Sequence, residues 1–428
     1  MVALALALLL SAPPLVQGDG GGSASFSSES RCANLLSALQ RDDVEAAAEP
    51  FDAALRSALP TTRLREVWRQ VLDSLGPLQR WSLVSITPRE GNDVCLADLS
   101  FATGALRATI SVNTHTHEVT GFYLRRPEAA ASPPSPLPSG VRAVEVSFGP
   151  APYRLSGTLT LPTAPGRHPA AVLLAGSGPM DRDETVGASA PLRDIAHGLS
   201  ARGVVVLRYD KRTRTYGAAL KGKAVTVEEE VLDDALEALT WLRRRPEVDP
   251  SSVWVVGHSL GALLAPEVAR RDGKVAGAVL LAPPGRPVPV LAVEQLRRRG
   301  SLPPERLAEM ERVAARIVAG TARPDETFLG APASYWMDLG QRDMVATAQR
   351  LGKPLLVLRG AEDEQVFSAD LAAWAAALKQ ARGASVETVP GVNHFFLPAA
   401  EGGPEKPSQV DPRVIARVGD FVTGGRSP

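Results

Sequence analysis

One pentapeptide has the residue types of a covalent catalyst. Residues 253–264 read VWVVGHSLGALL and contain GHSLG at 257–261, with Ser259 at its centre. A serine between two glycines at this spacing matches the G-x-S-x-G turn, which presents a serine hydroxyl as a nucleophile. With 37 glycines in 428 residues a chance match is credible. The pentapeptide therefore has meaning only with partner residues and a fitting local structure.

A nucleophilic serine needs a base, and histidine is the side chain suited to that role at neutral pH. The chain has six histidines. His115 and His117 lie on one face of a predicted N-terminal strand, His168 precedes a strand at the opposite end of the sheet, and His197 falls within a predicted helix. His258 adjoins Ser259, so the local backbone makes it a poor partner for that hydroxyl. Elimination leaves His394, in the loop sequence VPGVNHFFLP.

A catalytic histidine needs an acid that fixes its tautomer and stabilises its charge. The apolar run PLLVLRG ends at Gly360, and Glu362, Asp363 and Glu364 follow it. An acid at this point falls between the serine and the histidine in chain order, as expected for an α/β hydrolase. Spacing alone does not choose among the three carboxylates.

The elements that must position these residues follow residue 140. Continuous apolar runs separated by helical stretches predict strands that are buried on both faces of a parallel sheet. VRAVEVSF and YRLSGTLTLP predict an antiparallel pair before them. The clearest helix begins at Thr226, which forms a predicted capping box with Glu229, and extends toward Arg245. This is a doubly wound α/β domain, and its function is expected at the carboxyl ends of the strands. The apolar runs are PAAVLLAG, GVVVLRYD, VWVVGH, AGAVLLAPP and PLLVLRG.

Ser259 lies where one of these strands turns into a helix. The strand ends at His258, and Leu260 to Ala269 can form the helix. Because strand and helix cross closely in such a turn, side chains larger than glycine at 257 and 261 would collide. The helix N-terminus also favours negative charge beside the serine.

Composition divides the chain into domains. Residues 127–140 hold five prolines and predict a linker. Residues 31–126 combine helical periodicity with three alternating segments, 94–101, 106–113 and 118–126, which predicts a small α+β domain. We expect the catalytic domain at 141–428. Within it, residues 285–350 are rich in Arg and Glu and predict a mostly helical lid, or else a surface excursion without substrate contact.

The first 18 residues predict a signal peptide. The apolar start is too short to span a membrane comfortably, and a small-x-small pattern ends at Gly18. The Gly/Ser-rich residues 19–30 are expected to be flexible, and the protein to be exported to the periplasm or outside the cell. The start lacks Lys and Arg, so a buried N-terminus is the alternative. Cys32 and Cys95 are either disulfide-bonded or two buried thiols.

Charge and cysteine content exclude several classes of partner. Lys+Arg and Asp+Glu are both 47, so the net charge is zero and indicates neither nucleic acid nor an anionic surface. Two cysteines without a neighbouring histidine predict no zinc site, and no cofactor or membrane anchor is expected.

Several of these motifs together resemble a known family. GHSLG at 257–261, GAED at 360–363 and GVNH at 391–394 are similar to the nucleophile, acid and base motifs of the α/β-hydrolase superfamily. LAGSGPMDRDE at 174–184 resembles the oxyanion loop of a bacterial branch with exported esterases and dienelactone-hydrolase-like enzymes. The resemblance implies an α/β-hydrolase fold and a small preceding domain. It selects Asp363 as the acid, and it assigns the oxyanion hole to the backbone N–H groups of Ser177 and Leu260.

The expected function is hydrolysis of carboxylic esters with small or medium acyl groups. Ser259 would attack the ester, with His394 as base and Asp363 orienting it. A serine peptidase, a thioesterase or an acyltransferase is the alternative, because the same triad serves all of them. A non-catalytic binding protein on this scaffold is a further alternative. The N-terminal domain is also a candidate for self-association.

Overall fold

The computed structural model describes residues 27–89, 91–102, 104–125, 136–220, 222–223, 225–300, 302, 304–399 and 408–425. The predicted signal peptide, residues 19–26 and residues 127–135 of the predicted linker lie outside these ranges. The chain divides into two compact units between residues 128 and 129, and residues 296–307 group with the smaller, N-terminal unit. No helix within the described ranges has both the length and the apolar character needed to cross a bilayer.

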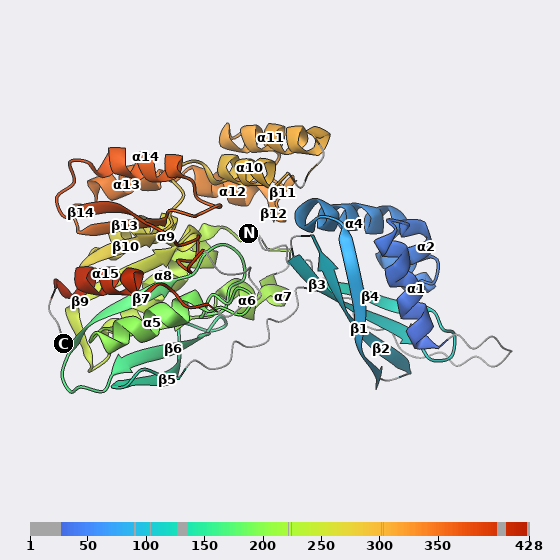
Figure 1. Cartoon of the computed structure of the whole chain (residues 1–428), viewed down its shortest axis with the longest axis horizontal. Helices are drawn as coiled ribbons and strands as arrows, with labels where there is room; N and C mark the ends of the chain where they lie inside the picture. Colours follow the sequence, from blue (N-terminus) through green and yellow to red (C-terminus); the bar gives the residue numbers. More distant parts are fainter. Residues whose placement is uncertain are drawn as a thin grey trace. The chain divides into compact units, whose positions relative to one another are not determined.

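Four helices and a four-stranded antiparallel sheet form the smaller unit (Figure 1). Asp43 and Asp52 cap the second and third helices, because each carboxylate accepts a hydrogen bond from a backbone N–H of the first turn. Helix α4 buries a stripe of apolar residues that includes Leu64 and Trp68. The elements are α1 (Ser28–Gln40), α2 (Val44–Ala48), α3 (Ala53–Ala58), α4 (Thr61–Leu75), β1 (Leu78–Arg89), β2 (Asn92–Phe101), β3 (Gly104–Asn113) and β4 (Val119–Arg125).

The sequence predicted only three of these strands, and β1 was missed. It is an edge strand that pairs with β2 alone. Most of its side chains are exposed, and Val84 is among them. Since neither face is cleanly buried, its apolar residues do not alternate clearly with polar ones.

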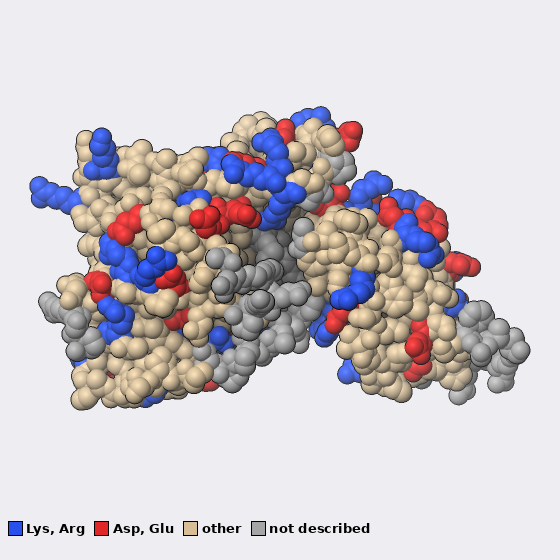
Figure 2. All heavy atoms as spheres, in the orientation of Figure 1, with Lys and Arg blue, Asp and Glu red and all other residues tan. Residues whose placement is uncertain are grey.

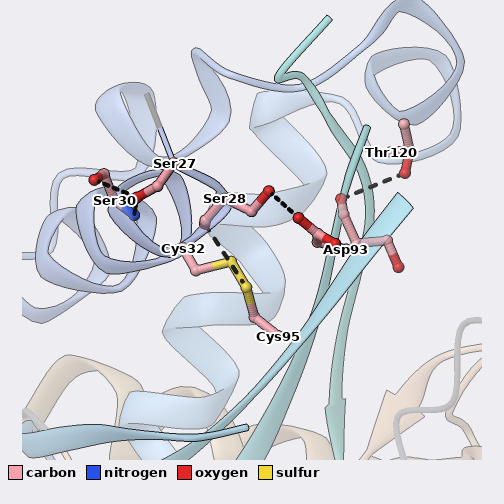
Figure 3. Close-up of a disulfide and its surroundings, with 8 residues drawn as sticks. Ser27, Ser28, Ser30, Cys32, Asp93, Cys95 and Thr120 are labelled. Atoms are coloured by element: carbon pink, nitrogen blue, oxygen red, sulfur yellow. Dashed lines mark hydrogen bonds between the residues drawn. A yellow bond between two sulfur atoms is a disulfide. The ribbon is translucent and has the colours of Figure 1, made fainter. Parts of the chain in front are cut away.

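A disulfide joins Cys32 of α1 to Cys95 of β2 (Figure 3). Both cysteines are fully buried, so the bond ties the first helix to the sheet from inside the core. The two positions are 63 residues apart, and closing such a loop contributes about 4 kcal/mol in the chain-entropy model. The structure therefore selects the disulfide over two free thiols.

The larger unit contains an eight-stranded sheet with the order β14-β13-β10-β9-β7-β8-β6-β5. Strands β7 to β10, β13 and β14 pair in parallel, and β5 and β6 add an antiparallel edge. Every residue of β8 and β10 is buried, as expected for a sheet covered on both faces. The strands are β5 (Val141–Phe148), β6 (Leu155–Pro162), β7 (His168–Leu174), β8 (Val205–Tyr209), β9 (Val248–His258), β10 (Gly277–Leu281), β13 (Leu355–Gly360) and β14 (Ala384–Val389).

Helices between the strands complete this fold, which is the predicted α/β-hydrolase fold. Helices α5 and α15 share one hydrophobic core with the sheet. This core includes Leu199 of α5, Val414 of α15, Val256 of β9 and Leu356 of β13. Short helices α6 (Arg212–Thr215) and α7 (Gly217–Leu220) follow β8. The other helices are α5 (Pro191–Ala201), α8 (Asp233–Arg243), α9 (Leu260–Asp272), α14 (Ser368–Leu378) and α15 (Pro412–Thr423).

The helix predicted from Thr226 begins differently from the expectation. The Glu229 carboxylate does accept from the Thr226 backbone N–H at 2.8 Å. The next turn, η1 (Glu228–Leu232), is a π-helix, and α8 continues from it. This wider turn contains Glu230, whose carboxylate is buried against Lys211. Single π turns occur frequently at functional sites.

The segment 285–350 is mostly helical, and its function as a lid stays a prediction. On the face of the molecule that Figure 2 shows, acidic and basic side chains are intermixed. The elements of this segment are α10 (Val288–Arg299), α11 (Pro304–Val318), β11 (Thr327–Phe328), β12 (Ala331–Pro332), α12 (Ala333–Gly340) and α13 (Met344–Arg350).

Candidate active site

Ser259 occupies a strained turn between β9 and α9. Its φ is 51° and its ψ is −114°, a conformation that side-chain-bearing residues rarely adopt. Such a residue costs of the order of 1–3 kcal/mol and persists where the surroundings impose it. A Cβ on Gly257 would collide with the backbone of Gly261, and a Cβ on Gly261 would collide with the carbonyl of Leu174. The first contact confirms the predicted collision of strand and helix at Gly257, whereas Gly261 is restricted by the end of β7, which the sequence did not predict.

The turn places Ser259 at the carboxyl end of the sheet. Its backbone N–H donates to the carbonyl of Leu281, the last residue of β10, at 2.8 Å. The loop after β7 lies against it, because a Cβ on Gly176 would be only 3.3 Å from the Ser259 Cβ. Leu260 is the first residue of α9, and the N–H groups of a first turn have no partner within their helix. The helix dipole adds a partial positive charge beside the serine.

His394 and Asp363 form a buried hydrogen-bonded pair. The Nδ1 atom of His394 lies 2.8 Å from Oδ2 of Asp363. The other oxygen, Oδ1, accepts from the backbone N–H groups of Gln365 at 2.7 Å and Val366 at 2.8 Å. Both acidic neighbours of Asp363 are exposed. The geometry therefore favours Asp363 among the three carboxylates that the sequence left open.

Burial and charge set the protonation of this pair. Burial raises the pKa of Asp363, but His394 and the two backbone hydrogen bonds outweigh it and leave the pKa below its usual value. For His394, burial lowers the pKa more than the Asp363 charge raises it, and His258 lowers it further. At neutral pH the pair is thus a carboxylate beside a neutral imidazole that can accept a proton.

The loop that carries His394 is fixed by its own hydrogen bonds. The Asn393 side-chain oxygen accepts from the backbone N–H of Phe395 at 2.9 Å and of Leu397 at 3.1 Å. A Cβ on Gly360 would collide with the carbonyls of Val392 and Asn393. The end of β13 and the histidine loop therefore pack backbone against backbone, which brings the Asp363 turn beside His394.

Ser259 and His394 belong to one cluster through His258. The rings of His258 and His394 have centroids 4.8 Å apart, and Ser259 follows His258 directly. Among the described residues, no hydrogen bond joins the Ser259 hydroxyl to the His394 ring. Catalytic hydrogen bonds are often long without substrate and tighten in the complex.

His258 bridges two parts of the site that the sequence did not connect. Its Nδ1 lies 2.9 Å from Oε1 of Glu184, and its Nε2 lies 2.9 Å from the His394 carbonyl oxygen. Both partners are acceptors, so both ring nitrogens carry protons. Burial lowers the pKa of His258, but Glu184 and the carbonyl outweigh it and raise the pKa above its usual value. Both ring nitrogens of His258 are thus occupied by buried partners, which agrees with its exclusion as the base.

The loop at 174–184, which carries the predicted oxyanion donor Ser177, is held by buried charges. Oε1 of Glu184 accepts from the Gly176 backbone N–H at 2.7 Å, and Nζ of Lys211 donates to the Gly176 carbonyl at 3.0 Å. Further along, Arg182 pairs with Asp210 at 2.7 Å. Sequence reasoning gave Glu184 and Lys211 no function, because only the folded chain brings the end of this loop and a residue after β8 to Gly176.

The remaining histidines do not join the site. His168 begins β7 and His197 lies in α5, as predicted. The prediction that His115 and His117 lie on a strand face is wrong. They lie in the turn between β3 and β4, where Asn113 accepts from the His115 N–H at 2.8 Å. Within the described residues, no group of three or more His, Cys, Asp and Glu side chains could hold a metal ion.

Comparisons with known proteins agree with this fold. Residues 171–403 match the model of the Alpha/beta hydrolase family. Esterase EstD of Thermotoga maritima is 39% identical over 274 residues, which are 63% of this chain and 65% of that protein. The chain therefore spans just under two thirds of that relative. Polyketide transferase ATR5 of Stachybotrys chlorohalonatus is 32% identical over 92 residues, 22% of this chain and 31% of that protein.

A solved structure, Est1E from Butyrivibrio proteoclasticus, matches 66% of this chain and 98% of its own with 19% identity and a TM-score of 0.45. A dienelactone hydrolase-like promiscuous phosphotriesterase, P91 from metagenomic libraries, matches 67% of this chain and 99% of its own with 16% identity and a TM-score of 0.41.

Replacing Asp363 tests the choice among the three carboxylates. Asp363→Asn should lower kcat by about 10⁴-fold, because an amide no longer holds His394 in the reactive tautomer or stabilises its charge. Glu362→Gln and Glu364→Gln are matched controls at exposed neighbours and should stay near wild type. Steady-state hydrolysis of a nitrophenyl ester measures all three. A larger loss in either control than in Asp363→Asn would contradict the assignment.

The pKa of His394 predicts the acid limb of activity. Only the neutral imidazole accepts a proton, so kcat/KM should rise with pH through the His394 pKa. Since that pKa is lowered, the midpoint should fall below the ordinary histidine value of 6.5. A pH profile of kcat/KM on a neutral ester measures it. A midpoint above 6.5 would mean that burial and His258 do not control the base.

Proposed function

The chain belongs to the alpha/beta hydrolase family, and we propose that it is a serine hydrolase that cleaves carboxylic esters of small or medium acyl groups. One observation supports this most strongly. The His394–Asp363 pair is buried, with Nδ1 and Oδ2 2.8 Å apart, and the His394 ring packs against His258, the residue before a serine in a strained strand-to-helix turn. A nucleophile with its base and acid requires both the buried acid–base pair and a serine presented in such a turn.

In the proposed first step, the Ser259 hydroxyl attacks the ester carbonyl carbon. His394 takes the hydroxyl proton on Nε2, and Asp363 stabilises the resulting imidazolium through Nδ1. The tetrahedral intermediate collapses when His394 returns that proton to the leaving alcohol, which departs and leaves an acyl-Ser259 ester. Water then attacks this ester with His394 again as base, the bond from the acyl carbon to the Ser259 oxygen breaks, and His394 returns the proton to that oxygen as the carboxylic acid is released.

The negative oxygen of each intermediate would lie between two backbone N–H groups, those of Ser177 and Leu260. The position of Leu260 at the start of α9 and the approach of Gly176 to Ser259 support this arrangement. Donors that are already in place pay no reorganisation cost during the reaction. Loss of one such donor typically lowers turnover by about 10² to 10³.

The ester class is proposed from the relatives and not from a shaped pocket. One relative is named an esterase and another a polyketide transferase. An acyl-enzyme can give its acyl group to water or to another acceptor, so the two activities differ only in deacylation. We choose ester hydrolysis because the matched region of the esterase is three times as long as that of the transferase. Self-association through the smaller unit stays a prediction.

Replacing the nucleophile tests the proposal. Ser259→Ala should abolish hydrolysis of nitrophenyl esters and labelling by a fluorophosphonate, because both reactions need the serine oxygen. The wild-type protein should hydrolyse acetate to octanoate esters faster than a thioester or an aminoacyl anilide of the same acyl group. Ser251→Ala is a matched control, since that exposed serine lies at the other end of β9.

Labelling of Ser259→Ala at the wild-type rate would show that another residue is the nucleophile. Faster turnover of the thioester or the anilide would change the substrate class but keep the triad. Acyl transfer to an added alcohol that exceeds hydrolysis would favour the transferase instead.

We also propose that the protein is exported through a signal peptide at residues 1–18. The Cys32–Cys95 disulfide supports this, because disulfides persist mainly in oxidising compartments. Intact mass of the protein from the periplasm or medium of a bacterial host should lack the first 18 residues. In the denatured protein its cysteines should resist alkylation until reductant is added, because both are paired. A cytoplasmic, full-length protein with two alkylatable thiols would contradict the proposal.

A further inference from the structure

Three buried side chains, Tyr335, Glu230 and Lys211, form a hydrogen-bonded series that ends at the Gly176 loop. Nζ of Lys211 donates to the Gly176 carbonyl at 3.0 Å and to Oε1 of Glu230 at 2.5 Å. The Tyr335 hydroxyl donates to Oε2 of Glu230 at 2.6 Å. We propose that Lys211, held by Glu230 and Tyr335, orients and polarises the peptide between Gly176 and Ser177, whose N–H is an oxyanion donor. This inference rests on the proposed function.

The burial of these charged side chains indicates a function beyond packing. Lys211 is 4% exposed and Glu230 is 6% exposed, and lysine and glutamate are almost never buried to this degree without a partner. An ion pair at this depth is weak support for stability, because the desolvation of both charges offsets their attraction. A positioning function gives a reason to keep the two charges at this place.

Peptide geometry links the Gly176 carbonyl to the Ser177 N–H. The two groups share one planar trans peptide, so they point in opposite directions. Fixing the carbonyl on the Lys211 ammonium therefore fixes the direction of the N–H. The preceding N–H, that of Gly176, is bound by Glu184 at 2.7 Å. The backbone of the loop is thus held by a buried charge on each side of Gly176.

The ammonium also changes the strength of the donor. A positive charge on a peptide oxygen draws electrons from the peptide, and hydrogen-bonded groups in a low-dielectric interior polarise one another. The Ser177 N–H becomes a better donor to a developing oxyanion. Lys211 itself does not touch the reacting atoms in this account, so it is a positioning residue. Its own backbone N–H donates to the Met180 carbonyl at 3.1 Å, a second attachment to the same loop.

Tyr335 connects the hydrogen-bonded series of Glu230 and Lys211 to the segment 285–350. It lies in α12, where its ring packs edge-on against Trp336 with centroids 5.1 Å apart. The Trp336 indole N–H donates to the Phe328 carbonyl at 2.8 Å, which fixes the start of the helix. Burial, and then Glu230, raise the pKa of Tyr335 well above its usual value, so the hydroxyl stays a donor. A helix of the predicted lid is thereby connected to the oxyanion loop through side chains alone.

A paired substitution separates this function from a structural one. Lys211→Met leaves the Glu230 carboxylate buried without its cation and should destabilise the protein. Adding Glu230→Gln removes that charge and should restore much of the melting temperature. If Lys211 positions the oxyanion donor, kcat of the double variant should stay about 10- to 100-fold below wild type, within the loss for one oxyanion donor. KM should change little.

The decisive readout compares an ester with its thiono analogue, in which sulfur replaces the carbonyl oxygen. Sulfur accepts hydrogen bonds poorly, so an intact oxyanion hole favours the oxygen ester. The ratio of kcat/KM for ester over thionoester should fall at least about tenfold in the double variant. Tyr335→Phe removes a single hydroxyl and should lower the same ratio by a smaller factor. It serves as a second variant should the double variant not fold.

A control removes a partly buried ion pair of the same unit. Arg243→Met with Asp272→Asn breaks a pair whose atoms lie 2.5 Å apart between α8 and α9, without contact to Gly176. It should keep the wild-type kcat and ratio. A double variant or a Tyr335→Phe variant with an unchanged ratio would overturn the inference while wild-type hydrolysis stands. A wild-type protein without ester hydrolysis would overturn the proposed function and this inference with it.

Discussion

The site depends on how closely β9, α9 and the end of β7 cross. At Gly257 and Gly261 the backbones approach so closely that neither position has space for a Cβ. This contact turns the chain sharply at the residue between them and keeps Ser259 at a positive φ. The same turn starts α9, so the serine and the unpaired N–H groups of a helix N-terminus occupy one place. A packing constraint with no chemistry of its own thereby creates the setting for chemistry.

Buried charges then fix the parts that packing leaves free. The Gly176 loop is held by Glu184 on one side and Lys211 on the other, and His258 connects Glu184 to the His394 carbonyl. Each charge is desolvated, which is unfavourable unless its partners are well placed. Together they connect the loop, the turn and the histidine through hydrogen bonds with fixed partners. The two halves of the proposed machinery, base and oxyanion hole, therefore share one polar network.

Local patterns predicted seven of the eight strands of the larger sheet and the strand-to-helix turn, because each is encoded in adjacent residues. Strand β14 was not predicted, because it is an edge strand without a buried face. His394 followed from elimination among the six histidines. Local patterns could not choose Asp363 over its neighbours, since that choice depends on which carboxylate is buried against His394. They also gave no function to Glu184 and Lys211, which lie in polar loops and reach Gly176 only in the folded chain. Strand β1 was missed because an exposed edge lacks the alternation that a half-buried strand shows.

The central claim is that Ser259 is a nucleophile facing an oxyanion hole made by the Ser177 and Leu260 amides. A crystal structure of the protein inactivated with a small fluorophosphonate tests it most directly, because the phosphonyl oxygen mimics the oxyanion. We predict a covalent bond from phosphorus to the Ser259 oxygen, with the phosphonyl oxygen at hydrogen-bond distance, about 2.7–3.1 Å, from both nitrogens. An adduct on another residue, or a phosphonyl oxygen directed away from both amides, would contradict it.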